Sequence, residues 1–195
     1  MHLEGLYADG EINPDQEVAR LIGARRIVLQ FPVQWYSTPP LLQMWQDTVP
    51  TRMFYMNAET DGAQIAGRPL LVAATAGDSP SAYSASGVNL FPLPELLLPL
   101  RATAHRCGLG WQEPFLVYEA RSALDAVLEK AAQAYSERLR ALGTLRGGAH
   151  RARPRIVRAE ILPPHVIGRW PGSPKPTGAS RRPPSGPRLR PALRG

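Results

Sequence analysis

The stretch from Arg26 to Asp47, RIVLQFPVQWYSTPPLLQMWQD, decides the fold of this chain. Its first residues, Arg26 to Phe31, form a short aliphatic run of the kind that buried parallel strands use. Pro32 ends this run, and a turn that carries Trp35 and Tyr36 follows it. The stretch therefore predicts a buried strand that leads into an aromatic loop.

A helix is predicted directly after this loop. Thr38 is the expected N-cap, and Pro39 is the expected first helical residue. Leu41, Trp45 and Val49 recur every four residues and give the helix an apolar face. Ligands of open α/β sheets bind outside the carboxyl ends of the strands, so the aromatic loop stands where a planar ligand would lie.

The loop carries a family resemblance. Gln30 to Tyr36, QFPVQWY, with Pro-Pro-Leu-Leu and Trp45-x-Asp47 following, resembles the isoalloxazine-binding loop of the flavodoxin-like NAD(P)H:quinone reductases. That family includes the ancillary quinone reductases of glutathione-gated potassium efflux systems. The resemblance implies a flavodoxin-like fold, a doubly wound parallel α/β sheet with strand order 2-1-3-4-5. Without it, the same residues read as a strand and a helix whose aromatics only fill a core.

A second buried strand is predicted at Pro69–Thr75, PLLVAAT, and it runs into a turn of small residues. Small residues let the backbone approach a ligand and point its N–H groups at an acceptor. From the residues alone, an ordinary β–α turn is the alternative interpretation. By resemblance, Ala74-Thr75-Ala76-Gly77 matches the Thr-Thr-Gly-Gly turn that contacts the polar edge of the flavin ring.

A third segment resembles the Tyr-x-x-x-Gly loop on the substrate side of these enzymes. It contains Tyr83, Gly87 and Asn89, and several quinone reductases have a His at the place of Asn89. Asn can donate a hydrogen bond but cannot shuttle protons near neutral pH. The resemblance implies that Tyr83 and Asn89 position nicotinamide and then quinone. It also implies that backbone groups of nine residues hold the isoalloxazine: Pro32, Val33, Gln34, Trp35, Tyr36, Ala74, Thr75, Ala76 and Gly77.

Helices are predicted on either side of these segments. Asn13 and Pro14 form a cap and first-turn pair for a helix that ends near Gly23. Pro94 opens another helix, in which Pro99 is expected to cause a kink.

The last part of the predicted domain contains one strand and one helix. The strand is expected at 113–120. Ser122 and Asp125 form a capping-box pattern for a long amphipathic helix that closes at Gly143.

The domain is expected to be incomplete at its N-terminus. His2 to Tyr7 resembles the end of the family's second strand, so the first strand, its phosphate loop and the first helix would precede Met1. That absence predicts an unpaired sheet edge and the loss of the helix N-terminus that holds the flavin phosphate. The chain has no G-x-G-x-x-G and no G-x-x-x-x-G-K-[ST] motif as a replacement.

Composition divides the chain into two parts. Residues 143–195 hold eleven Arg and one Lys against one Glu, giving +11, whereas residues 1–142 carry −4, so the net +7 comes from the tail. The tail contains ten of the 21 prolines and is predicted to be disordered. Residues 1–142 therefore form the predicted flavodoxin-like domain. The tail has one aromatic residue, Trp170, and no nucleic-acid module, so no specific nucleic-acid partner is expected.

Other features bound the location and the chemistry. No apolar run approaches the ~20 residues of a membrane span, and the N-terminus lacks the pattern of a signal peptide. Cys107 is the only cysteine, which favours a cytoplasmic protein, with the inner face of the membrane as a peripheral alternative. The four histidines lack the spacing of metal ligands, and no G-x-S-x-G motif of serine hydrolases occurs.

The leading hypothesis is a flavin-dependent NAD(P)H:quinone oxidoreductase, as the resemblance implies. FMN is favoured over FAD, NAD(P)H is the hydride donor, a quinone is the acceptor, and the protein is expected to form a homodimer. A second hypothesis is a non-catalytic regulatory subunit that docks on a potassium-efflux transporter. A third is an inactive, truncated product.

Overall fold

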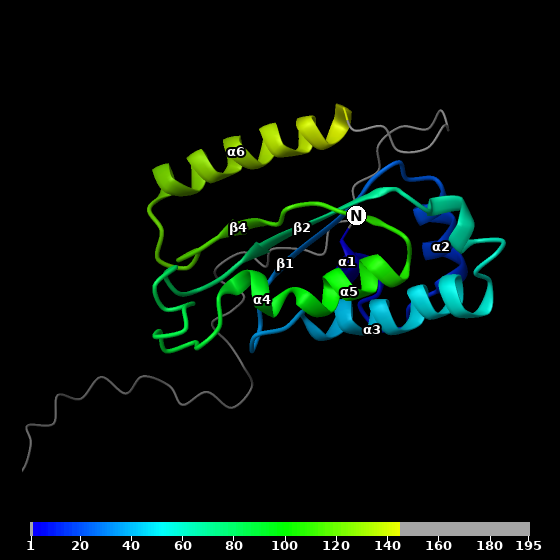
Figure 1. Ribbon diagram of the computed structural model, residues 1–195, viewed down its shortest axis with the longest axis horizontal. Helices are drawn as coiled ribbons and strands as arrows, with labels where there is room; N and C mark the ends of the chain where they lie inside the picture. The colour runs from blue at the N-terminus through cyan, green and yellow to red at the C-terminus, as the bar shows by residue number, and fades with distance from the viewer. Residues whose placement is uncertain (1, 145–195) are drawn as a thin grey trace, which may run out of the picture.

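The structure is a computed structural model, and it describes residues 2–144. A parallel sheet lies between two helical layers (Figure 1), which confirms the predicted doubly wound α/β class. The predicted disordered tail lies, from Leu145 onward, outside the described residues. Within residues 2–144, no helix is both long and apolar enough to cross a bilayer.

The sheet is built around β2. The strands are β1 (Ile27–Pro32), β2 (Pro69–Thr75), β3 (Gly110–Trp111) and β4 (Phe115–Val117). β1 pairs with one edge of β2, and β3 and β4 pair with successive parts of the other edge, all in parallel. The strands predicted at 26–31 and 69–75 are thus confirmed within one residue.

The strand predicted at 113–120 is confirmed only in its central part, as β4, and the two-residue β3 precedes it at Gly110–Trp111. Gln112 still donates its N–H to Leu70 O at 2.9 Å, but Pro114 has no N–H to continue the ladder. Glu119, with φ of 54°, turns the chain out of the extended conformation after β4.

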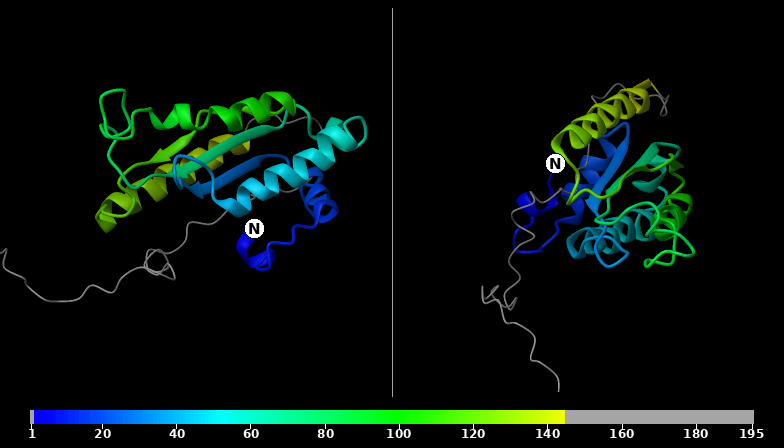
Figure 2. Two further views of the ribbon diagram at one scale, coloured as in Figure 1. Left: turned by 90° about the horizontal axis from the view of Figure 1, so that it is seen from below. Right: turned by 90° about the vertical axis from the view of Figure 1, so that its left-hand side faces the viewer.

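Helices cover both faces of the sheet. Figure 2 shows α6 on one side and the other helices on the opposite side. The elements on the opposite side and at its margin are α1 (Leu3–Leu6), α2 (Pro14–Ile22), α3 (Pro40–Pro50), the π-helix η1 (Thr51–Met56), the 3₁₀ helix η2 (Gly62–Ile65), α4 (Leu93–Leu96) and α5 (Leu98–Arg106). The helix α6 spans Asp125–Thr144.

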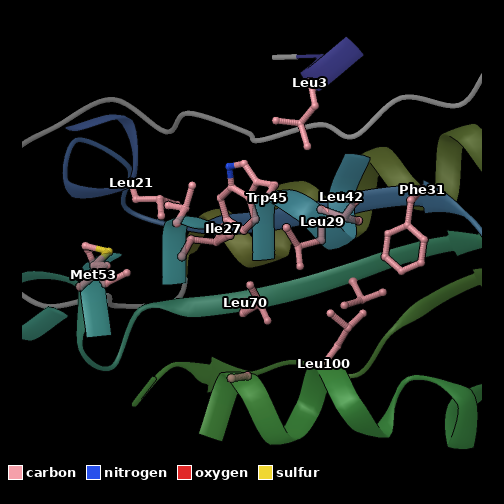
Figure 3. Close-up of a cluster of buried hydrophobic side chains, with 14 of the residues drawn as sticks. Leu3, Leu21, Ile27, Leu29, Phe31, Leu42, Trp45, Met53, Leu70 and Leu100 are labelled. Carbon is pink, nitrogen blue, oxygen red and sulfur yellow. The ribbon is translucent and has the colours of Figure 1, made fainter. Parts of the chain in front are cut away.

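The main core lies between the sheet and α3 with α5. Alternate residues of β1, Ile27, Leu29 and Phe31, point into it, as strand geometry requires. Figure 3 shows these side chains with Trp45 of α3 and Leu100 of α5. On the α6 side the core is smaller, and its fully buried members are Val28, Leu71 and Leu142.

The helix after the aromatic loop begins one residue later than predicted. Pro39 is its N-cap without a side-chain hydrogen bond, and the Thr38 hydroxyl instead donates to Gln43 Oε1 at 3.3 Å. Trp45 and Val49 are buried as expected. Leu42, not Leu41, completes the fully buried face.

Capping is confirmed for α2 and corrected for two later helices. The Asn13 side chain accepts a hydrogen bond from Gln16 N at 3.1 Å. The helix predicted from Pro94 breaks at Leu97, and Pro99 stands in the first turn of α5, where no N–H is needed. Ser122 does not cap α6; its hydroxyl donates to Glu119 O at 3.3 Å.

The N-terminal segment is a helical turn and not the strand end that the resemblance implied. Leu3 and Tyr7 are both buried, and their spacing of four residues fits a helix against a core rather than an alternating strand. Within residues 2–144, no strand pairs with the second edge of β1. The segment instead packs against α3.

A buried carboxylate fastens this segment to the core. Glu17 of α2 is fully buried and accepts hydrogen bonds from Tyr7 Oη at 2.6 Å and from Trp45 Nε1 at 2.9 Å. Arg20 supplies the compensating charge. Burial and the contact with Glu17 raise the pKa of Tyr7, so its hydroxyl remains a donor. One side chain therefore joins α1, α2 and α3.

We predict that Glu17→Ala lowers the free energy of unfolding by ~3 kcal/mol, because it leaves the buried Tyr7 and Trp45 donors unpaired. Urea unfolding of the full chain, followed by far-UV circular dichroism, measures this loss. Glu11→Ala, at an exposed position, is the control and should change stability by less than about 0.5 kcal/mol. Equal effects of the two variants would contradict the structural role of Glu17.

Candidate functional site

The candidate site lies where the loops after β1, β2 and β4 meet. Val33 N–H donates to Thr75 O at 2.8 Å, and Ala76 N–H donates to Val117 O at 2.8 Å. These bonds continue the parallel ladders past the ends of the strands and hold the three carboxyl ends level. Carboxyl ends of parallel strands are the usual ligand site of open α/β sheets.

The aromatic loop is a tight turn. Gln34 and Ser37 exchange two backbone hydrogen bonds of 3.0 Å, and the central residues Trp35 and Tyr36 have φ of 45° and 64°. These angles are those of a type I′ turn, which Asn-Gly normally occupies. Within residues 2–144, the backbone N–H groups of Trp35 and Tyr36 meet no acceptor, and the Trp35 side chain is 92% exposed.

The turn after β2 divides into a structural part and an open part. Ala74 is buried in the sheet, and Ala76 is engaged on both sides, since its O also accepts from Ala120 N at 3.0 Å. Gly77 is exposed, and in the described part of the chain its N–H has no acceptor. Thr75 is half-buried. Of the four residues that were predicted to contact the ring here, Ala74 to Gly77, Gly77 is the one whose backbone N–H can donate a hydrogen bond to a ligand.

A side-chain clamp joins the first two loops. Tyr36 Oη donates to Asn89 Oδ1 at 3.1 Å, and Asn89 Nδ2 donates to Asp78 Oδ2 at 3.1 Å. Both ends of the Asn89 amide are therefore engaged by the protein. The structure brings Asn89 to the site, and it places that side chain between two loops.

The loop that carries Tyr83 is held by its own backbone. Asn89 N–H donates to Ala82 O at 3.0 Å, and Leu90 N–H donates to Gly87 O at 3.0 Å. A Cβ at Gly87 would lie 2.2 Å from Ala82 O, so only glycine fits this close approach. This explains the glycine of the Tyr-x-x-x-Gly pattern.

Two tyrosines face each other beside this loop. The rings of Tyr83 and Tyr118 have centroids 6.0 Å apart and are tilted by 58°. Burial, with smaller effects of Asp78, Tyr36 and Tyr118, raises the pKa of Tyr83. Burial also raises the pKa of Tyr118. Both phenols therefore remain neutral hydrogen-bond donors throughout the physiological range.

Backbone strain in the described part of the chain concentrates at this edge of the sheet. Among residues 2–144, the non-glycine residues with positive φ are Trp35, Tyr36, Leu90 and Glu119, and all four lie in these three loops. Such conformations cost about 1–3 kcal/mol each and cluster at ligand sites. This strain supports the choice of this edge as the candidate site independently of any motif.

Sequence reasoning missed three site residues, Asp78, Tyr118 and Arg121. Tyr118 directly follows β4, and this position after a parallel strand is the signal that could have identified it. Arg121 packs across the open glycine, with its Cδ 3.7 Å from the place of a Gly77 Cβ. No pattern in the sequence indicates the Asp78–Asn89 bond, which joins residues eleven positions apart.

The arrangement suits a planar, hydrogen-bond-accepting ring. Unpaired N–H groups at Trp35, Tyr36 and Gly77 can meet ring acceptors, and the exposed aromatic side chains offer flat apolar surface. No group of three His, Cys, Asp or Glu within residues 2–144 could hold a metal ion.

Comparison with known proteins identifies the family. A family model described as flavodoxin-like fold, Flavodoxin_2, matches residues 2–139. The chain belongs to this family. Among its relatives, the uncharacterized NAD(P)H oxidoreductase YdeQ of Bacillus subtilis is 36% identical over 129 residues, 66% of this chain. The ancillary protein KefF of the glutathione-regulated potassium-efflux system of Klebsiella pneumoniae is 36% identical over 134 residues, 69% of this chain. This flavodoxin-like chain spans 64% of the length of the first relative and 73% of the second.

Solved structures agree with this assignment. An NADPH-quinone reductase from P. pentosaceus is 28% identical, with a TM-score of 0.60, over 66% of this chain and 75% of its own. General stress protein 14 of Treponema denticola, solved in complex with FMN, is 25% identical, with a TM-score of 0.62, over 74% of this chain and 79% of its own. The flavodoxin-like fold is thus shared with proteins of this kind.

We predict that Gly87→Ala loosens the loop at 79–91 without unfolding the domain, because the clash is confined to that loop. Hydrogen–deuterium exchange should show at least about tenfold faster exchange at Asn89 and Leu90 N–H, with β1 and β2 unchanged. Gly143→Ala is the control, since no atom of the described residues lies within 4 Å of a Cβ there. Unchanged exchange in the loop would contradict the predicted clash.

Proposed function

We propose that this protein is a flavin-dependent NAD(P)H:quinone oxidoreductase. The observation that carries the proposal is the strained turn at Trp35 and Tyr36, whose N–H groups, like that of Gly77, meet no acceptor within residues 2–144. The names of YdeQ and of the P. pentosaceus structure support the reaction class.

FMN is the proposed cofactor, and the complex of general stress protein 14 with FMN supports it over FAD. Trp35, Tyr36 and Gly77 would hold the ring through backbone donors, with Pro32, Val33 and Gln34 shaping the turn and Ala74, Thr75 and Ala76 supporting it. When bound, a flavin accepts a hydride from NAD(P)H and passes two electrons to a quinone. The protein orients the rings.

Tyr83 is the proposed substrate-positioning donor, because its phenol is protonated at neutral pH and lies beside Tyr118. Nicotinamide and quinone would use this place in turn. Asn89 acts differently from a free donor: its amide holds Tyr36 against Asp78, so we assign it the role of positioning the aromatic loop.

The first experiment is reconstitution of the full chain with FMN. After desalting, the visible spectrum should show retained flavin that bleaches with NAD(P)H under anaerobic conditions and recovers on addition of a quinone. A folded protein that retains no flavin, or flavin that does not bleach, would overturn the proposal.

We predict that Tyr83→Phe lowers kcat/KM for the quinone about tenfold, the cost of one lost hydrogen bond to substrate. Because the pKa of Tyr83 is raised, the phenol stays protonated and the defect should be constant from pH 6 to ~9. Steady-state kinetics at several pH values measure it. Ser136→Ala, which removes an exposed hydroxyl on α6 away from the site, is the control.

A homodimer is part of the proposal. Large apolar side chains are exposed on η1 and α5: Tyr55, Met56 and Leu98. Arg106 of α5 lies over the Tyr55 ring at 5.4 Å, which places these elements on one surface. Such a surface favours association with a second copy.

Light scattering should give twice the chain mass of 21.4 kDa for the native protein. Met56→Glu should shift the mass toward the monomer, because it places a charge in the apolar surface. Leu124→Glu makes the same change just before α6, at a side chain that is 75% exposed, and should leave the dimer intact. A monomeric native protein would contradict the prediction.

A second candidate function is that of an ancillary subunit on a potassium-efflux transporter. The 36% identity with KefF supports it, and it would place the protein at the inner face of the membrane. Co-purification with the cytoplasmic domain of such a transporter tests this. Binding by the flavin-free protein, without quinone reduction, would favour the second function over the first.

A further inference from the structure

One cation stands among the loops of the candidate site. The loops at 33–37, 76–91 and 118–121 contain three charged side chains, those of Asp78, Glu119 and Arg121. Asp78 is engaged, since its Oδ2 accepts the 3.1 Å hydrogen bond from Asn89 Nδ2. Within residues 2–144, no carboxylate forms an ion pair with Arg121, and its side chain makes no hydrogen bond to these residues. In the described part of the chain, its guanidinium is therefore an uncompensated positive charge.

Backbone hydrogen bonds fix the place of Arg121. Glu119 N–H donates to Asp78 O, and the next N–H along the chain donates to Ala76 O, each at 3.0 Å. These two bonds hold the segment after β4 against the turn after β2, on either side of Gly77. Arg121 follows directly, so the fold itself sets its backbone beside this glycine.

The stem of Arg121 lies on Gly77. Its Cδ is 3.7 Å from the place of a Cβ at Gly77, which is an ordinary van der Waals contact. The guanidinium begins at the next atom of the chain, and it stays exposed while the stem packs, as is usual for arginine. The N–H of Gly77 meets no acceptor within residues 2–144. A cation and a free backbone donor thus stand side by side.

The other polar groups of the site carry no positive charge. Because burial raises the pKa of Tyr83 and of Tyr118, both phenols are neutral. The Asn89 amide is hydrogen-bonded at both ends. A ligand that develops a full negative charge at this edge meets one full countercharge in the three loops, that of Arg121.

A flavin ring that accepts a hydride develops such a charge. A hydride carries two electrons and one proton, so its loss leaves the nicotinamide with a positive charge, and its arrival gives the flavin ring one negative charge. That charge gathers on the polar edge of the ring, where charged protein groups tune the cofactor. An N–H group and a guanidinium suit such an acceptor, because charge-assisted hydrogen bonds are about twice as strong as neutral ones.

We infer that Arg121 contacts the polar edge of the bound flavin ring and stabilises the negative charge of its two-electron-reduced form. The inference rests on the proposed function, and it extends that function by naming a residue that sets the reduction potential. Adjacency carries it, because the stem of Arg121 lies on Gly77, whose N–H is proposed to hold the same ring.

Arg121→Met tests the charge, because methionine keeps an apolar stem over Gly77. In the FMN-loaded protein the reduction potential should fall by ~30 mV or more, which is a tenfold change in the equilibrium constant of the two-electron couple. Arg121→Lys keeps the charge and should retain most of the native potential. Arg101→Met removes an exposed arginine of α5 outside the three loops and is the matched control. Equilibration with a reference dye, followed by absorbance, measures the potential.

Sulfite tests the same charge without a nicotinamide. Its sulfur lone pair forms a bond to N5 of the oxidised flavin, and the ring of the adduct gains the negative charge. Titration followed at the visible flavin band should give a Kd about tenfold higher for Arg121→Met than for the native protein or Arg101→Met. If Arg121→Met does not fold by far-UV circular dichroism, Arg121→Gln replaces it in both measurements.

The outcomes separate this inference from the proposed function. If the native protein retains no flavin, or its flavin does not bleach with NAD(P)H, the proposed function fails and the inference with it. If the native flavin bleaches but Arg121→Met has the native potential and the native sulfite affinity, the inference alone fails. A raised KM for NADPH at an unchanged potential would show that Arg121 binds a nucleotide phosphate instead, and this result would also overturn it.

Discussion

Two backbone hydrogen bonds hold the functional edge of this molecule together. One runs from Val33 N–H to Thr75 O and the other from Ala76 N–H to Val117 O. Each lies just beyond the end of a strand, and together they fix three loops at the same height. They anchor the aromatic turn, whose central residues Trp35 and Tyr36 offer N–H groups that the turn itself does not use.

The helices support this edge from beneath. Glu17 ties the first two helices to Trp45, and Trp45 in turn packs on the strands that carry the loops. A buried carboxylate is costly unless it is fully hydrogen-bonded, and here three side chains meet it. Asn89 forms a comparable link at the surface, because its side-chain amide is hydrogen-bonded to both Tyr36 and Asp78 and so joins two loops.

The sequence predicted the elements whose pattern is local. The apolar runs of β1 and β2 and the Asn13 cap of α2 are legible from a few neighbouring residues, and the family resemblance supplied the fold class. The sequence did not predict the elements whose conformation depends on contacts with residues far away in the chain. Leu3 and Tyr7 lie in a helical turn because they pack on α3, and Pro114 splits a strand that an apolar run alone would continue.

The sequence predicted which residues lie at this edge of the sheet. It did not predict which of their polar groups are already hydrogen-bonded within the protein. Motif and resemblance placed Trp35, Tyr36 and Gly77 at one edge of the sheet, where the structure has them. They could not show that the Ala76 N–H is already engaged, or that the Asn89 amide bridges two loops. Such facts depend on hydrogen bonds between segments that are far apart in sequence.

The positive φ angles of Trp35 and Tyr36 have a consequence for how this protein can be altered. An Asn-Gly pair would relax the turn and stabilise the fold by about 1 kcal/mol or more, yet it would remove both aromatic side chains. Selection for thermal stability alone would therefore favour losing the two aromatic residues that we propose to contact the flavin. Their strained backbone sets stability and binding in opposition at a single turn.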